Sequence, residues 1–93
     1  MKNNNNIVNI NKLGQILSDE NTLYKFNDLY INVYRVKNDI NGNPLYHISF
    51  YNKYMENITE IFKGKIGRYY KNKKYITIQS YNLSNTIRYI LNK

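Results

Sequence analysis

The chain has 93 residues, with 14 Lys and Arg against 6 Asp and Glu, so its net charge is +8 at neutral pH. It contains no cysteine, which excludes disulfide bonds, thiolate catalysis and cysteine metal sites. No apolar run approaches the roughly 20 residues of a membrane-spanning helix, and Met1–Asn6 lacks the apolar core of a signal peptide. We therefore expect a cytoplasmic protein.

The length predicts one modest domain over residues 7–93, preceded by a polar, flexible lead-in over residues 1–6. The positive charge favours an anionic partner, such as nucleic acid, a nucleoprotein or an acidic protein surface. An alternative is that an AT-rich genome supplies the abundant Asn, Lys, Ile and Tyr, so that much of the charge reflects codon composition. The overall charge leaves both interpretations open.

The first expected element is a short helix. Ile10, Leu13 and Leu17 recur at spacings of three and four residues, which places them on one face of a helix. Leu23–Phe26 would then form a turn or a short strand that leads into the next element.

The central element is a β-hairpin built from Leu29–Val36 and Leu45–Tyr51, which are rich in residues that favour strands. Asn41 and Gly42 tolerate positive φ and are a strong signal for the connecting turn. Both faces carry large side chains, so we expect one face to pack on helices and the other to form a Tyr-rich surface. The alternating sets are Ile31 and Val33 against Tyr30, Tyr34 and Val36, then Tyr46, Ile48 and Phe50 against Leu45, His47, Ser49 and Tyr51.

Helices are expected on both sides of a second strand region. Tyr54–Phe62 has an apolar stripe at helical spacing and predicts the second helix. One or two strands follow over Ile66–Tyr70 and Tyr75–Tyr81, the latter with Ile76 and Ile78 facing the core. The chain ends in a third helix with an apolar face formed by Leu83, Ile87, Ile90 and Leu91.

These elements predict an α+β fold. We expect an antiparallel sheet of three to four strands built on the central hairpin, with about three short helices packed on one face.

Catalytic groups are sparse in this sequence. His47 is the only histidine, so no second His or Cys could complete a metal site. The six acidic residues are scattered over turns and helix ends. Gly64–Arg68 lacks the Gly-Lys-Ser/Thr ending of a phosphate-binding loop and reads as a turn. We expect no enzymatic activity, no cofactor and no metal.

The candidate binding segment is Lys63–Tyr75, which combines cations with aromatic rings and contains no acidic residue. Cations neutralise phosphates, and tyrosine rings offer stacking faces for unpaired bases. The alternative is a solvated turn that keeps a sheet edge soluble. The candidate residues are Lys63, Lys65, Arg68, Tyr69, Tyr70, Lys71, Lys73, Lys74 and Tyr75.

Two fragments, Tyr34–Tyr46 and Gly67–Lys71 continued through Ser80–Leu83, resemble small proteins of unassigned function from phages and mobile elements of AT-rich bacteria. The resemblance covers about half of the chain. It implies a class of small phage inhibitors of host defence, anti-CRISPR proteins above all, which act by binding. Many of these are acidic mimics of nucleic acid, whereas this chain is basic.

We therefore expect a non-enzymatic, anti-CRISPR-like inhibitor that binds and blocks a host CRISPR effector or another nucleoprotein in the host cytoplasm. The alternative is a small basic nucleic-acid-binding module, and a minor third possibility is an accessory or homodimeric scaffold protein. Neither a membrane nor a small-molecule substrate is expected as a partner. The dependence of binding on salt separates the first two functions, because direct phosphate binding weakens steeply as salt rises.

Overall fold

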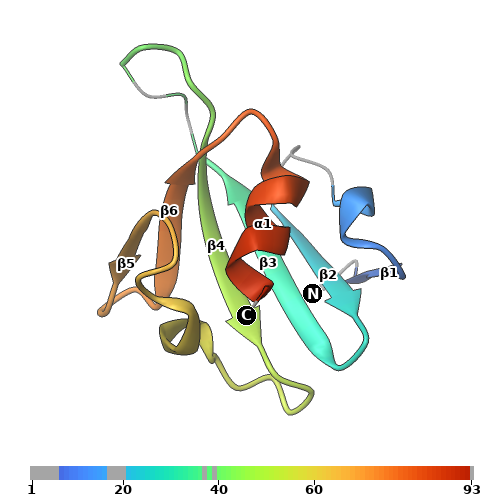
Figure 1. Cartoon of the computed structure of the whole chain (residues 1–93). Coiled ribbons are helices and arrows are strands. Elements are labelled where there is room, and N and C mark those ends of the chain that lie inside the picture. The colour runs from blue at the N-terminus through green and yellow to red at the C-terminus, as the bar shows by residue number, and fades with distance from the viewer. Residues whose placement is uncertain (1–6, 17–20, 37, 39, 93) are drawn as a thin grey trace, which may run out of the picture.

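A six-stranded sheet forms the body of the protein in this computed structural model, which describes residues 7–16, 21–36, 38 and 40–92 (Figure 1). The strands lie in the order β1-β2-β3-β4-β6-β5. All neighbouring pairs are antiparallel except β1 and β2, which run parallel. The elements are β1 (Ile7–Ile10), η1 (Leu13–Gln15), β2 (Thr22–Phe26), β3 (Leu29–Arg35), β4 (Leu45–Tyr51), η2 (Thr59–Phe62), β5 (Arg68–Tyr70), β6 (Tyr75–Gln79) and α1 (Leu83–Leu91).

The predicted central hairpin is confirmed as β3 and β4. Ile31 lies opposite Phe50 and Val33 opposite Ile48, so one face of the hairpin is a continuous apolar surface. Gly42 has a φ of 84° in the connecting loop, a conformation that side chains with a Cβ rarely adopt. The alternation of apolar residues specifies the register, because a shift by one residue would turn them all to the other face.

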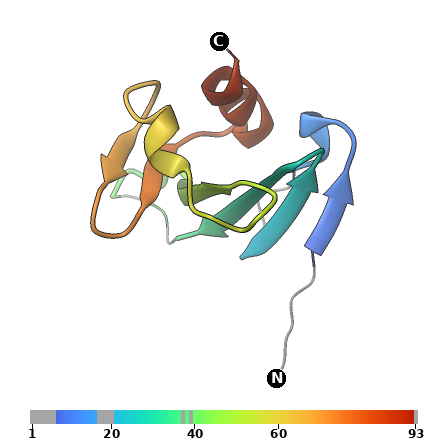
Figure 2. The ribbon, with the colours of Figure 1, turned by 90° about the horizontal axis from the view of Figure 1, so that it is seen from below.

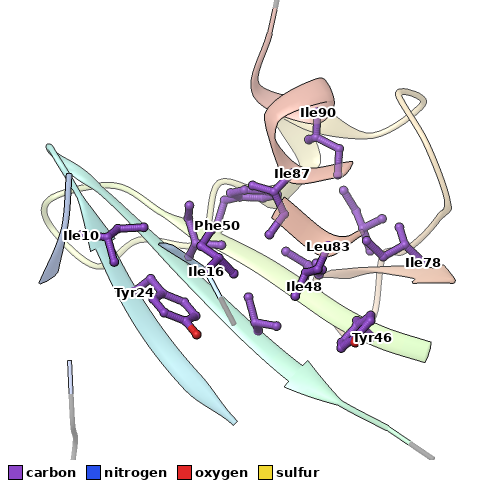
Figure 3. Close-up of a cluster of buried hydrophobic side chains, with 13 residues drawn as sticks. Ile10, Ile16, Tyr24, Tyr46, Ile48, Phe50, Ile78, Leu83, Ile87 and Ile90 are labelled. Atoms are coloured by element: carbon purple, nitrogen blue, oxygen red, sulfur yellow. The ribbon is translucent and has the colours of Figure 1, made fainter. Parts of the chain in front are cut away.

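The core lies between this apolar face and α1, which crosses the sheet diagonally (Figures 1 and 3). Each strand alternates its side chains between the two faces, so every second residue of β3, β4 and β6 points into the core. Figure 2 shows α1 and η2 on the same side of the sheet. The buried apolar side chains are Ile10, Ile16, Tyr24, Ile31, Val33, Tyr46, Ile48, Phe50, Ile76, Ile78, Leu83, Ile87 and Ile90.

The expected sheet of three to four strands with three helices is wrong, because the sheet is mixed and has six strands. The first predicted helix is replaced by β1 and the short 3-10 helix η1. Ile7 and Val8 are β-branched and favour a strand, which pairs its backbone with β2. Ile10 is the buried last residue of β1, Leu13 begins η1, and Ile16 follows η1 and is buried, so their regular spacing does not come from an α-helix. Leu17 lies outside the described residues.

The second predicted helix, Tyr54–Phe62, is also wrong, since only its last four residues form the 3-10 helix η2. Met55 has a φ of 63°, which no α-helix allows. The Asn52 side-chain oxygen accepts hydrogen bonds from two backbone N–H groups just after it, at 2.9 and 3.0 Å. Thr59 Oγ1 accepts another from the Phe50 N–H at 2.9 Å. Local side-chain acceptors thus hold this stretch in a loop and compete with helix formation.

The C-terminal part follows the prediction more closely. Ile76 and Ile78 are buried in the core as predicted, and the third predicted helix is confirmed as α1. The Asn82 side chain caps α1 by accepting a hydrogen bond from the Asn85 N–H at 3.2 Å. The predicted lead-in over residues 1–6 lies outside the described residues. Within the described part of the chain, no helix is both long and apolar enough to cross a bilayer.

Candidate functional site

The side of the sheet opposite α1 is the candidate site, and we call it the open face. Among the described residues, no helix lies on this side (Figure 2). No Asp or Glu occurs in any of the six strands, so no strand contributes an acidic side chain to it. The open face presents aromatic, amide, hydroxyl and basic groups, together with aliphatic side chains such as Leu23 and Leu45.

Four rings and one guanidinium follow one another across the open face from β3 to β5, and we call them the aromatic strip. The rings of Tyr34 and His47 lie 6.0 Å apart between centroids. His47 and Tyr75 stack at 3.9 Å with only 11° between their planes. Tyr70 meets Tyr75 edge-on at 5.6 Å, and the Arg68 guanidinium carbon lies 5.3 Å from the Tyr70 ring centroid. The strip crosses four neighbouring strands without an interruption.

Sheet register builds this strip from residues far apart in sequence. Tyr34 lies opposite His47, His47 opposite Thr77, and Thr77 opposite Arg68, so these four form one row across the sheet. Tyr70 and Tyr75 form a pair in the next row. Because residues directly opposite one another are close in an antiparallel sheet, the rings of the two rows come into contact.

His47 is neutral within the strip at ordinary pH. Partial burial of the ring is the main cause that lowers its pKa below the usual 6.5, and the positive charge of Lys73 lowers it further. A neutral imidazole stacks on Tyr75 without bringing a buried charge into the ring pair.

Stability should depend on pH through this histidine. Its folded-state pKa is depressed, so the unfolded chain binds the proton first as the pH falls below about 6.5, and the free energy of unfolding decreases. We expect the wild type to lose more stability than His47→Gln between about pH 7.5 and about pH 5.5 in urea unfolding experiments. Equal losses in both proteins would show that His47 titrates as freely in the folded state as in the unfolded chain.

The residues predicted from the basic segment separate into two groups. Arg68, Tyr70 and Tyr75 belong to the aromatic strip. Lys71, Lys73 and Lys74 are exposed in the tight turn between β5 and β6, beside the end of the strip. The structure thus brings six of the nine predicted residues to one end of the open face.

The other three predicted residues lie away from the strip. The Lys63 ammonium is 3.5 Å from the Glu60 carboxylate at the end of η2. Lys65 donates a hydrogen bond to the backbone carbonyl of Asn92, 2.9 Å away beyond α1. Tyr69 alternates to the core side of β5 and packs against the buried cluster. Because side chains alternate between the two faces of a strand, neighbouring residues of the basic segment lie on opposite sides of the sheet.

Tyr34 and His47 are strip residues that the basic segment does not contain. Tyr34 was part of the expected Tyr-rich face of the hairpin, and the sequence presented His47 as an isolated histidine. The sequence pattern that indicates these two residues is the alternation along β3 and β4, which puts both on the face opposite Ile48. Only the pairing of β4 with β6 connects them to Tyr75.

A shallow depression of about 290 Å³ lies beside the strip on the open face. The short side chains of Asn32 and Ser49 lie opposite each other between longer aromatic neighbours, which leaves this space. In the described part of the chain, no group of three or more His, Cys, Asp or Glu could hold a metal ion. The lining residues are Asn21, Asn32, Tyr34, His47, Ser49 and Tyr75.

Comparison with known proteins identifies a phage family. Residues 26–93 match the family described as Staphylococcus phage terminal repeat-encoded protein TreK. The chain belongs to this family. The match confirms the phage origin that the sequence indicated, and it covers the whole aromatic strip. No curated protein and no solved structure matches the chain.

Proposed function

We propose that this phage protein is a non-catalytic binding protein that holds single-stranded nucleic acid on the open face of its sheet. The aromatic strip carries this proposal. It places tyrosine rings beside Arg68 and the lysine-rich β5–β6 turn, on strands that contain no acidic residue. Grooves that bind single strands combine stacking rings with cations in this way.

The exposure of the rings supports base stacking. Tyr34 is 43% exposed and Tyr70 is 38% exposed, so both ends of the strip offer ring surface to a ligand. His47 and Tyr75 stack on each other in the middle of the strip. Each base stacked on an aromatic side chain contributes about 1–3 kcal/mol. Such contacts are available to unpaired bases and not to bases inside a duplex.

Fluorescence anisotropy with labelled oligonucleotides tests the proposal. We expect single strands of about twelve nucleotides, DNA or RNA, to bind more tightly than the matching duplex. The logarithm of the association constant should fall with the logarithm of salt concentration by about 0.7 for each neutralised phosphate. Arg68→Gln should lower this slope by about 0.7, whereas Arg88→Gln on α1 should leave it unchanged. Binding weaker than roughly 0.1 mM at physiological salt, or equal slopes in both variants, would contradict the proposal.

A second candidate function is an anti-CRISPR-like inhibitor that blocks a host CRISPR effector or another nucleoprotein. Membership of a phage family favours it, as does the tyrosine content of the open face, since tyrosine is enriched at protein interfaces. Binding anchored by buried tyrosines would depend little on salt. Purified effector complexes, with and without nuclease treatment, distinguish the two functions. Capture that survives nuclease and inhibits the effector would favour this second function.

A further inference from the structure

We propose that the depression beside the strip is a base-selective pocket, which prefers a base with an exocyclic amine to one with a carbonyl at the same position. This inference rests on the proposed binding of single strands. It adds a discrimination between bases that stacking on tyrosine rings does not supply. The pocket would accept cytosine or adenine and disfavour uracil and thymine.

The shape of the depression suits one base. Tyr34, His47 and Tyr75 contribute rings to its lining, and its volume is about 290 Å³. Asn32 and Ser49 face each other across β3 and β4 on the same side of the sheet. A base that leaves the stack and enters edge-first would therefore meet ring atoms at the rim and the polar atoms of Asn32 and Ser49 at its edge.

The polar atoms determine which edge fits. Ser49 Oγ donates its hydrogen to the backbone carbonyl of Lys74, 3.2 Å away, so toward the depression it offers lone pairs that accept hydrogen bonds. The Asn32 side chain also lines the depression, and its amide offers both a donor and an acceptor.

An exocyclic amine beside a ring nitrogen matches this arrangement. The amine donates to Ser49 Oγ or Asn32 Oδ1, while the ring nitrogen accepts from the Asn32 amide. A carbonyl in place of the amine would point its lone pairs at those of Ser49. Polar groups left unpaired in this way are the strongest source of discrimination between similar ligands.

Oligo(dC) and oligo(dU) of equal length test the pocket, because cytosine and uracil are both pyrimidines that differ at this edge. We expect the wild type to bind oligo(dC) at least about fivefold more tightly than oligo(dU). Ser49→Ala removes the lone pairs that disfavour a carbonyl, so it should bring the two dissociation constants together while the strip still binds both oligonucleotides. Asn32→Asp removes the amide donor that the ring nitrogen of cytosine needs, so it should weaken the oligo(dC) complex more than the oligo(dU) complex.

The outcomes separate this inference from the proposed function. Wild-type protein that binds both oligonucleotides equally would overturn the pocket and leave single-strand binding intact. A preference for oligo(dC) that persists in Ser49→Ala would also overturn it, since the edge would then be recognised elsewhere. Wild-type protein that binds neither oligonucleotide would overturn both. Circular dichroism of each variant establishes that the comparison is made between folded proteins.

Discussion

Ile78→Asp is expected to unfold the protein. The Ile78 side chain is only 3% exposed and lies in the core on β6, so the substitution places a carboxylate among apolar groups. Removing the buried side chain alone costs about 2–5 kcal/mol, and an unpaired buried charge adds to this. The sum approaches the total stability of about 5–15 kcal/mol that small proteins possess. Thermal unfolding followed by circular dichroism measures the effect.

Gln79→Asp is the matched control. Gln79 is the next residue of the same strand, points to the opposite side and is exposed, so the same carboxylate remains in water. We expect a melting transition close to that of the wild type. A cooperative, unshifted transition for Ile78→Asp would mean that the register of β6 is not the one described.

Tyr34→Ala combined with Tyr70→Ala should weaken single-strand binding by at least about thirtyfold, because each ring contributes about 1–3 kcal/mol of stacking. The two rings lie at opposite ends of the aromatic strip and are 43% and 38% exposed, so their removal leaves the core intact. The salt dependence should stay near that of the wild type, since no charge is removed. Anisotropy titrations across a range of salt concentrations measure both quantities.

Tyr89→Ala provides the control for this loss. Tyr89 lies on α1, is 58% exposed and belongs to the opposite side of the sheet, so its removal deletes the same ring away from the strip. We expect its affinity to equal that of the wild type. If the double variant also retains wild-type affinity, the strip does not stack bases, and the tyrosines would be free for a protein partner.

Local signals predicted the elements whose partners are close in sequence. Asn41 and Gly42 define the turn between β3 and β4, and the alternation of apolar residues defines their inner face. The apolar spacing and the cap at Asn82 define α1. Apolar spacing failed where other interactions decide the backbone. The edge strand β1 depends on pairing with β2, and the loop after β4 depends on the side chain of Asn52.

The candidate site was predictable only in part, for a related reason. The run of cations and tyrosines from Arg68 to Tyr75 marks one end of the strip in the sequence itself. Tyr34 and His47 join it through pairing across β3, β4 and β6, which no spacing within the chain reveals. Tyr69 is a residue of the run that does not belong to the strip, because it packs against the core while its two neighbours in β5 lie on the open face.

The position of β5 gives the two ends of the strip different freedom to open. β5 has three residues and, among the strands that the structure describes, is bonded only to β6, whereas β4, which carries His47, is held between β3 and β6. Short edge strands separate from a sheet at much lower free energy than central strands. We therefore expect Tyr70 and Arg68 to separate from the sheet more readily than His47 does. A single strand of nucleic acid could then reach the aromatic strip from the β5 edge of the sheet.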